Sequence, residues 1–288
     1  MESMFQRRTT GSVVCPSCGS LVGVRDESCY SCGRANPGLW GFGPMLRHLG
    51  HDFGFVPMVM VSSAVLYLVS LLLSGNAIRM DGLMSLLAPS TPVLFLLGAS
   101  GAIPVFGFGR WWTVLSAGWL HAGLLHIVFN MYYVRMFGPA TAEVIGPART
   151  VIIYTVAGVT GFALSSFAGM YLSWIPLPML RGAGFTVGAS APIFGLLGAL
   201  LHYSRNSSSL MKQQVLGFII PFFVFGLIMP GVDNYAHAGG FAGGYMMSAF
   251  LNPMTRERGD HILVAVLCLV ATALSIAVSI LTGLKLFR

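Results

Sequence analysis

Long apolar runs separated by short polar stretches dominate the chain from residue 57 to residue 284. Their lengths fall near the range of about 17 to 25 residues that a helix needs to cross the hydrocarbon core of a bilayer. Alternation of apolar and polar residues with a period of two, which a membrane β-barrel would need, is not evident. The pattern predicts seven membrane-spanning helices, with these approximate bounds: 57–74, 113–137, 150–170, 188–204, 214–230, 232–251 and 261–284.

The composition indicates an all-α polytopic membrane protein. The chain of 288 residues is 55% hydrophobic and 9% charged, whereas soluble globular domains carry about 25% charged residues. Its 36 glycines and 15 prolines suit a bundle whose helices pack closely on small residues and tolerate proline. The net charge of +7 does not require a nucleic acid partner, and we expect none, because excess Lys and Arg in membrane proteins gather in cytoplasmic loops.

The distribution of basic residues predicts a cytoplasmic N-terminus. If seven spans follow such an N-terminus, the cytoplasmic side holds all of the 16 Lys and Arg residues except Arg79, Arg110, Arg181, Lys285 and Arg288. This bias is the positive-inside pattern. We therefore expect an integral membrane protein of the bacterial inner (cell) membrane.

The connection between the first two predicted spans, from Ser74 to Trp112, is apolar but rich in proline and glycine in its middle. We expect an interfacial, partly embedded loop and not an eighth span. Trp111 and Trp112 would lie at the level of the lipid headgroups, where amphipathic rings are favoured.

Four cysteines near the N-terminus have the spacing of a zinc site. Cys15 and Cys18 form one Cys-x-x-Cys pair and Cys29 and Cys32 form another, each followed by a glycine that permits a tight turn. Four thiolates in this pattern suit a structural Zn²⁺ with closed tetrahedral coordination. Disulfides or redox-active cysteines are the less favoured alternative, because a segment without a secretory signal should stay in a reducing cytosol. Residues 1–50 are predicted to form a cytoplasmic zinc-ribbon-like segment and a linker.

Two polar residues lie in apolar segments, where such side chains are costly and usually functional. Ser190 would lie at the outer end of the fourth predicted span, and His237 in the outer half of the sixth, at a compatible depth. A neighbouring imidazole can act as a general base and activate a serine hydroxyl. A lone serine bonded to its own helix, or a lone histidine satisfied by a neighbouring helix, would be uninformative. As a pair, they predict a serine nucleophile with a histidine base.

The second predicted span carries three polar residues, His121, His126 and Asn130. His126 and Asn130 are four residues apart and share one helix face, from which two donors could stabilise the negative oxygen of a tetrahedral intermediate. His121 would serve the adjoining loop or a water path. A metal site formed by the two histidines and His237 is a less favoured alternative, because no intramembrane carboxylate joins them.

Small residues near the serine and the histidine predict a close approach of the fourth and sixth spans. Gly240 and Gly244 follow His237 on the same helical stripe, and a ridge of glycines lets two helix backbones approach closely. Gly188 leaves the backbone before Ser190 uncrowded, so that amide groups there could donate to a substrate oxyanion.

Four motifs occur in one order along the chain: Trp111-Trp112, His121-x-x-x-x-His126-x-x-x-Asn130, Gly188-x-Ser190, and Asn234-x-x-His237-x-x-Gly240-x-x-x-Gly244. With these motifs, the region from Arg110 to Gly244 resembles the rhomboid family of intramembrane serine proteases. Two departures from the usual family pattern are visible. Arg110 precedes the two tryptophans instead of following them, and Ala191-Pro192 follows the serine where many members have glycine.

The resemblance implies a six-helix rhomboid core over residues 51–252, followed by an additional C-terminal transmembrane helix within residues 253–288. It also implies a catalytic dyad without a third acidic member, in which Ser190 is the nucleophile and His237 is the base. The implied oxyanion site is formed by His126, Asn130 and the Ser190 amide, with Gly188 beside them. Phe194 would stack on the base, and Asn234 would be a polar residue near the dyad without assigned chemistry.

These features predict an intramembrane serine endopeptidase that cleaves transmembrane segments of membrane proteins within the lipid bilayer and needs no cofactor for catalysis. The alternative from another class is a noncatalytic rhomboid-like protein that binds membrane clients. Such relatives usually lack the nucleophile or the base, and this chain has both. A transporter or channel would show paired intramembrane charges or a repeated hydropathy pattern, and neither is evident.

Overall fold

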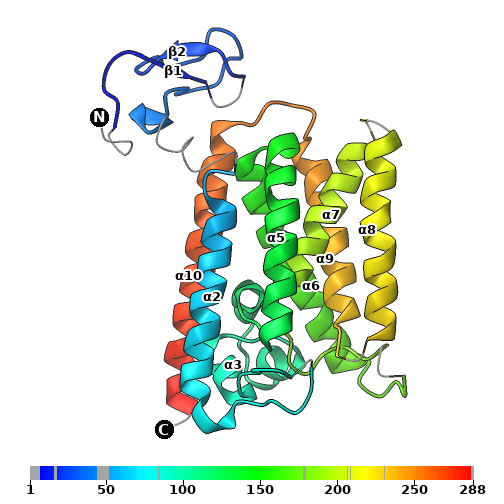
Figure 1. The fold of residues 1–288 in the computed structure, drawn as a ribbon. Coiled ribbons are helices and arrows are strands. Elements are labelled where there is room, and N and C mark those ends of the chain that lie inside the picture. The colour runs from blue at the N-terminus through cyan, green and yellow to red at the C-terminus, as the bar shows by residue number, and fades with distance from the viewer. Residues whose placement is uncertain are drawn as a thin grey trace.

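The computed structural model describes residues 7–15, 18–43, 52–83, 85–177, 180–205, 207, 209–229 and 231–286. A small β-hairpin unit at the N-terminus lies at one end of a bundle of long helices, and the C-terminal end of the chain lies at the other end (Figure 1). The predicted linker up to residue 50 falls largely outside the described residues, which resume at Asp52.

The N-terminal unit is built on two short antiparallel strands, β1 (Ser12–Val14) and β2 (Leu21–Gly23), with Val13 opposite Val22. Both valines are buried against Cys15 and Cys29. A core this small rarely holds a fold without a metal or disulfides. The strands therefore place the cysteines, and we expect the cysteines to stabilise the unit.

In the part of the chain that the structure describes, the bundle consists of seven long helices: α2 (Phe55–Ser74), α5 (Leu124–Ile145), α6 (Pro147–Tyr171), α7 (Ser190–Ser204), α8 (Ser209–Ile228), α9 (Asn234–Leu251) and α10 (Gly259–Leu286). The connection from α2 to α5 contains only short helical pieces in its described part: α3 (Thr91–Leu97), a π-helical turn (Ile103–Gly107), α4 (Thr113–Ser116) and a 3-10 turn (Ala117–Trp119). None of these pieces is long enough to span a bilayer.

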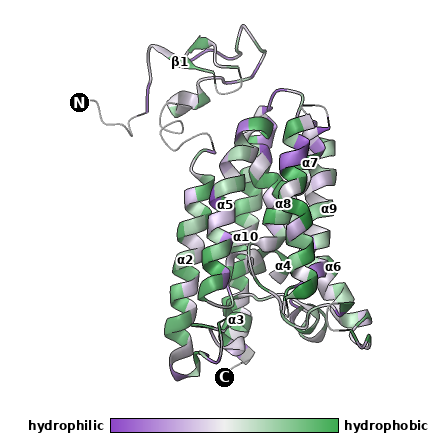
Figure 2. Cartoon of the chain, turned by 45° about the vertical axis from the view of Figure 1, so that its right-hand side comes forward, coloured by the Kyte–Doolittle hydropathy of each residue, from purple (hydrophilic) through white to green (hydrophobic). Residues whose placement is uncertain are grey.

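Four helices in the described part of the chain are long and apolar enough to cross a membrane. Their bounds are Phe55–Ala77, Pro147–Tyr171, Ser209–Ile228 and Gly259–Lys285. The bent pair Thr113–Trp119 and Leu124–Ile145 would make a fifth. Hydrophobic residues dominate the long helices (Figure 2). The protein is therefore an integral membrane protein. The number of seven spans stays a prediction, because α7 and α9 are shorter or less apolar and pack against α6 inside the bundle.

The predicted span over residues 113–137 is wrong in its bounds. The chain bends by 93° between the two parts of this segment, and the long helix runs from Leu124 to Ile145. Leu120 and Gly123 have extended backbone conformations that no helix contains. His121 therefore lies in the bend and not on the helix that carries His126.

Helices α7 and α9 touch through their backbones. A Cβ atom added to Gly240 would lie 2.2 Å from the carbonyl oxygen of Ala191, and one added to Gly244 would lie 2.1 Å from that of Gly195. Any larger side chain would push the helices apart. The glycines hold α7 and α9, which carry the predicted serine and histidine, at backbone contact.

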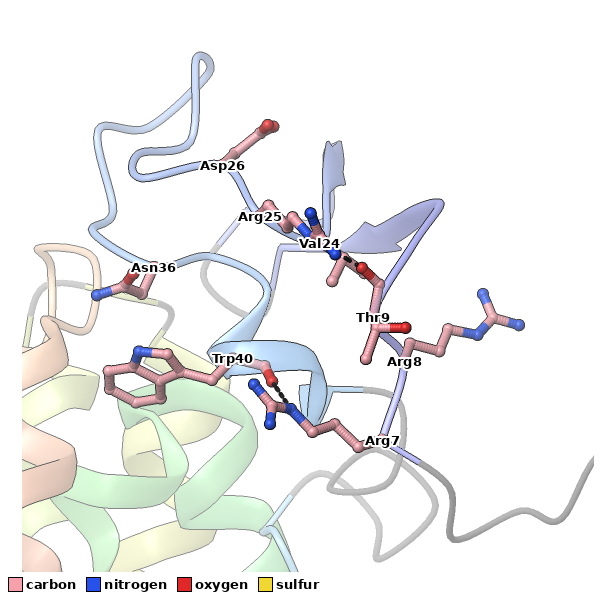
Figure 3. Close-up of a pocket in the computed structure, with 8 residues that line it drawn as sticks. All are labelled: Arg7, Arg8, Thr9, Val24, Arg25, Asp26, Asn36 and Trp40. Atoms are coloured by element: carbon pink, nitrogen blue, oxygen red, sulfur yellow. Dashed lines mark hydrogen bonds between the residues drawn. The ribbon is translucent and has the colours of Figure 1, made fainter.

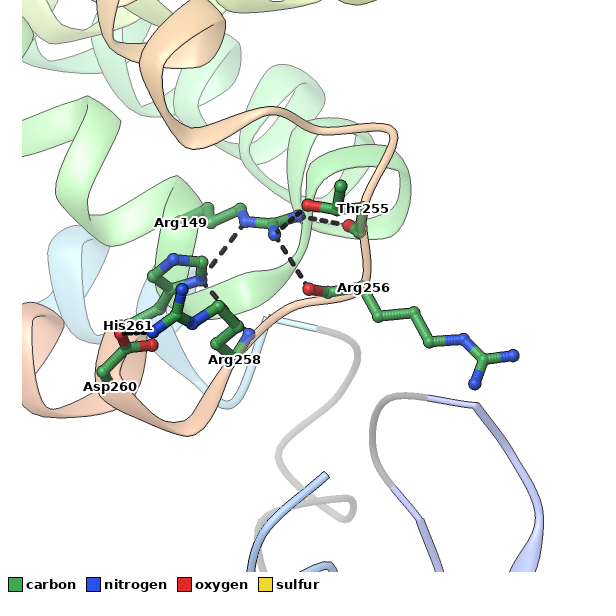
Figure 4. A network of polar contacts seen from close by, with 6 residues as sticks. All are labelled: Arg149, Thr255, Arg256, Arg258, Asp260 and His261. Carbon is green, nitrogen blue, oxygen red and sulfur yellow. Dashed lines mark hydrogen bonds and ion pairs between the residues drawn. The ribbon is translucent and has the colours of Figure 1, made fainter. Parts of the chain in front are cut away.

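At the end of the bundle near the N-terminal unit, the buried side chain of Arg149 binds the connection between α9 and α10 (Figure 4). Its guanidinium donates to the carbonyl oxygens of Thr255 and Arg256 at 2.8 and 3.0 Å, and its Nε lies 3.3 Å from Nδ1 of His261. The Arg149 amide donates to the Glu257 carboxylate at 2.9 Å. These bonds fix the point at which α10 begins.

Candidate active site

Ser190 and His237 face each other across the contact between α7 and α9. Ser190 is the first residue of α7, and its Oγ lies 2.9 Å from Nε2 of His237, which is buried on the first turn of α9. The ring of Phe194, one turn along α7, stacks on the imidazole with centroids 4.2 Å apart and planes 14° apart. Phe194 thus restricts rotation of the imidazole while Nε2 points at the serine.

The contact between these residues is compatible with the tautomer that a general base needs. If Nε2 of His237 accepts the Ser190 hydroxyl proton, the ring proton lies on Nδ1. Nδ1 has no hydrogen-bond partner among the residues that the structure describes. The arrangement is therefore a dyad in this part of the chain, with no carboxylate that orients the imidazole.

Three of the residues that were predicted for an oxyanion site converge beside Ser190. Gly188 has a φ of +127°, and a Cβ added to it would lie 2.5 Å from Nε2 of His126 and 3.7 Å from Nδ2 of Asn130. Glycine is needed here both for the positive φ and for the space. The absent side chain of residue 188 leaves room in front of two nitrogen atoms from α5.

Both α5 residues can present an N–H group to that space. Nδ1 of His126 accepts a hydrogen bond from the Ala122 amide at 3.3 Å, so a neutral His126 carries its proton on Nε2. Asn130 donates one amide proton to the carbonyl oxygen of His126 at 2.8 Å and retains a second. The Ser190 amide is in the first turn of α7, where amides have no partner within the helix. The site thus holds three donor groups.

The ring of His121 contacts the ring of His126. Its side chain is buried, and its ring centroid is 5.3 Å from that of His126 at an interplanar angle of 67°. Within the described part of the chain, it makes no hydrogen bond or ring contact with Ser190 or His237. We infer that it packs on His126 and helps to hold that ring.

Asp233 is a residue of this region that the sequence analysis did not single out. Its carboxylate caps α9 by accepting the Ala236 amide at 3.0 Å, and it also accepts the hydroxyl of Ser165 on α6 at 2.5 Å. An aspartate directly before the first helical residue is a recognisable N-cap signal, because its carboxylate can accept the amide of the third helical residue. Asn234, which was predicted near the dyad, donates from Nδ2 to the carbonyl oxygen of Gly226 at the end of α8.

The four N-terminal cysteines also converge. All four Sγ atoms lie within 4.8 Å of one another, with Cys15 and Cys32 at 3.7 Å and Cys18 and Cys29 at 3.6 Å. A tetrahedron with Zn–S bonds of about 2.3 Å has S–S edges of about 3.8 Å, whereas a disulfide would require about 2.05 Å. Hydrogen bonds from Ser20 lower the pKa of the Cys18 thiol to about 6. The four residues fit a metal ion.

A cavity of about 270 Å³ lies on the N-terminal unit and is lined by Arg7, Arg8, Thr9, Val24, Arg25, Asp26, Asn36 and Trp40 (Figure 3). Nε of Arg7 donates to the carbonyl oxygen of Trp40 at 2.8 Å, and Nε of Arg25 donates to that of Thr9 at 3.0 Å. These bonds join the start of the unit to its later turns. The N-terminal unit meets the bundle near the start of α10, where Arg256 contacts Ser31.

The chain is similar in sequence to several known proteins. The family model of the rhomboid domain matches residues 108–254, about half of the chain. RHOMBOID-like protein 1 of Arabidopsis thaliana is 30% identical over 167 residues, which cover 56% of this chain and 40% of that protein. RHOMBOID-like protein 6, mitochondrial, of the same organism is 31% identical over 170 residues, 57% of this chain and 52% of that protein.

A bacterial relative is also similar. Rhomboid protease GluP of Bacillus subtilis is 33% identical over 164 residues, which cover 55% of this chain and 30% of that protein. The chain therefore spans at most about half of the length of these three relatives. The part that the family model matches includes Ser190, His237 and the donor groups, but it ends at residue 254, before α10 begins at Gly259.

Proposed function

This chain belongs to the rhomboid family, and from that membership we propose that it is an intramembrane serine endopeptidase that cleaves transmembrane segments of membrane proteins. The observation that carries the proposal is the 2.9 Å contact between Ser190 Oγ and His237 Nε2. It is supported by the imidazole that stacks on Phe194 and by the N–H groups of His126 and Asn130 that face Gly188.

The reaction begins when Ser190 Oγ attacks the carbonyl carbon of a substrate peptide bond and its proton moves to His237 Nε2. The oxygen of the tetrahedral intermediate becomes negative and accepts hydrogen bonds from His126, Asn130 and the Ser190 amide. One such donor is worth about 3–4 kcal/mol in the transition state. The carbon–nitrogen bond then breaks, and His237 gives its proton to the leaving amine.

A water molecule completes the cycle. It attacks the acyl-enzyme carbonyl and gives a proton to His237, and the proton returns to Ser190 Oγ as the ester bond breaks. A regular helix protects its peptide carbonyls, so the substrate segment has to unwind near the cleaved bond. We expect glycine near that bond to favour cleavage, because it weakens helices by about 1 kcal/mol relative to alanine.

We propose that residues 1–50 form a cytoplasmic zinc-ribbon-like segment, that residues 51–252 form a six-helix protease core, and that residues 253–288 form an additional transmembrane helix. The zinc would bind Cys15, Cys18, Cys29 and Cys32. These four thiolates would fill all four coordination positions of the ion, which supports a structural and not a catalytic role for the zinc. The excess of Lys and Arg on the side of the N-terminus supports a cytoplasmic orientation in the inner membrane of a bacterium.

Labelling with a fluorescent fluorophosphonate probe tests the proposed activity without knowledge of the substrate. We expect wild-type protein in lipid vesicles to be labelled, and Ser190→Ala and His237→Ala to be unlabelled while they remain folded. His202→Ala is a matched control, because His202 lies on α7 and bonds to Ser248, not to Ser190. Folded wild-type protein that resists labelling would instead favour a noncatalytic binder of membrane clients.

A further inference from the structure

The C-terminal helix α10 makes buried polar contacts with the connection between α2 and α5. Ser275 and Ser279 lie on the face of α10 that packs against α3 and α4, and both side chains are buried. Their partners, Arg110 and Trp112, come from the segment that precedes α4. We name the four residues Arg110, Trp112, Ser275 and Ser279 the α10 clasp.

Arg110 is the centre of the α10 clasp. Its side chain is almost fully buried, and its guanidinium donates to the carbonyl oxygens of Phe95 at 2.6 Å and of Ser279 at 2.7 Å. The guanidinium carbon also lies 4.2 Å from the centroid of the Phe95 ring. No described carboxylate forms an ion pair with it. A buried charge with such partners is costly to disturb, because removal of one partner leaves a desolvated donor.

Trp112 adds two hydrogen bonds to the α10 clasp. Its indole Nε1 donates to Ser279 Oγ at 3.1 Å, and its carbonyl oxygen accepts the hydroxyl of Ser275 at 2.7 Å. Ser275 and Ser279 are four residues apart and therefore lie on one face of α10. Three hydrogen bonds thus join one face of α10 to residues 110–112.

The surrounding contacts leave no room for larger side chains. A Cβ added to Gly98 would lie 2.4 Å from Ser116 Oγ and 2.8 Å from Ser279 Oγ. A Cβ added to Gly283 would lie 3.1 Å from the Cα of Leu96. The position of α10 is therefore determined by backbone contact with the α3 region as well as by hydrogen bonds.

Hydrogen bonds connect the α10 clasp to the candidate active site. The hydroxyl of Thr113, the first residue of α4, donates to the carbonyl oxygen of Arg110 at 2.8 Å, and the hydroxyl of Ser116 donates to the carbonyl oxygen of Thr113 at 3.3 Å. The next residue, Ala117, accepts the amide of Gly188 at 2.9 Å through its carbonyl oxygen. Gly188 is the residue that leaves space in front of His126 and Asn130. A shift of α10 would therefore move α4 and, through Ala117, the backbone just before Ser190.

We propose that α10 is a positioning element of the active site, and that Ser279 and Ser275 act as positioning residues through Arg110, Trp112 and Ala117. The proposal rests on the proposed protease function and deepens it. The match to the rhomboid domain ends at residue 254, before α10 begins, so the role is assigned from this chain's own contacts.

The test compares variants of α10 in the full chain in lipid vesicles with the fluorophosphonate probe. Ser279→Leu places a bulky side chain against Gly98, and Ser279→Ala only removes the acceptor of the Trp112 indole. We expect the maximal labelling rate to fall on the order of tenfold in Ser279→Leu and by less in Ser279→Ala, since a misplacement of about 1 Å can cost about 100-fold. The probe concentration at half-maximal rate should stay unchanged, because the probe still binds.

Two variants on the same helix serve as controls. Ala277→Leu adds bulk on an exposed face of α10, and Leu281→Ala shortens a side chain of α10 that is 63% exposed. Both should be labelled at the wild-type rate. If Ser279→Leu does not fold, the labelling rates of Ser279→Ala and of the double variant Ser275→Ala/Ser279→Ala decide whether the serines have the positioning role.

The possible failures are distinguishable. Wild-type labelling rates in all folded Ser279 and Ser275 variants would overturn the positioning role and leave the protease proposal intact. A lower rate that only follows a loss of folded protein, measured by thermal unfolding, would also overturn it. Absence of labelling in the folded wild-type protein would overturn the protease proposal and this inference with it.

Discussion

Nε2 of His126 lies 2.5 Å from the position that a Cβ of residue 188 would occupy, so the identity of Gly188 and the direction of the His126 ring depend on each other. The contact joins the start of α5 to the backbone that precedes Ser190. It places Nε2 of His126 against the Gly188 backbone, while the same ring accepts the Ala122 amide on its other nitrogen.

Gly188→Ala should therefore nearly abolish activity. The methyl group would displace His126, and the φ of +127° would be strained for alanine, at a cost on the order of 1–3 kcal/mol in stability. We expect the maximal labelling rate to fall by about 100-fold or more, because donors act only when they are well placed. Gly217→Ala is the control, since nothing lies within 4 Å of its added Cβ. Normal labelling of Gly188→Ala would contradict the donor arrangement.

Asn130→Ala should slow turnover of a cleaved transmembrane peptide by about 100- to 1,000-fold, the usual effect of one lost oxyanion donor. The residual rate should exceed that of Ser190→Ala, because His126 and the Ser190 amide remain. Thr141→Ala is a matched control on α5, since Thr141 bonds only to its own helix at Phe137. A folded Asn130→Ala that is as inactive as Ser190→Ala would indicate a different role.

Asp233→Ala should destabilise the protein by about 1–2 kcal/mol through the loss of the α9 cap, and it would also leave the Ser165 hydroxyl without its acceptor. Thermal unfolding in detergent would measure the change. Asp233→Asn should retain much of the stability, because its side-chain oxygen can still accept the Ala236 amide. Equal unfolding midpoints for Asp233→Ala and wild type would argue against the cap.

Replacement of Cys15 and Cys18 by serine should release bound zinc, from about one ion per chain to none, as measured by mass spectrometry of metals. Cleavage of a generic transmembrane substrate should remain, because the N-terminal unit contacts the bundle near Arg256 and not near Ser190. Cys268→Ser should leave the zinc content unchanged. An inactive but folded double variant would mean that the zinc-ribbon-like segment contributes to the active structure.

The second predicted span shows where sequence patterns fail. Residues 113–137 are apolar enough for one helix, and the helix would have placed His121, His126 and Asn130 on one element. The chain bends by 93° within this segment, because Leu120 and Gly123 are extended. Gly118 faces α7 closely, since a Cβ added to it would lie 3.4 Å from Cγ of Pro192. Hydrophobicity measures where a chain is buried, and it does not report a bend that a distant helix imposes.

Hydropathy, motif order and thiol spacing are local properties of the chain, so the sequence is enough to predict the membrane character, the rhomboid family and the two Cys-x-x-Cys pairs. The positive φ of Gly188, the cap at Asp233 and the α10 clasp are visible only in the folded protein. Arg110 and Ser279 are 169 residues apart, and no local pattern records such a contact. These features arise where helices from distant parts of the chain pack and satisfy one another's buried polar groups.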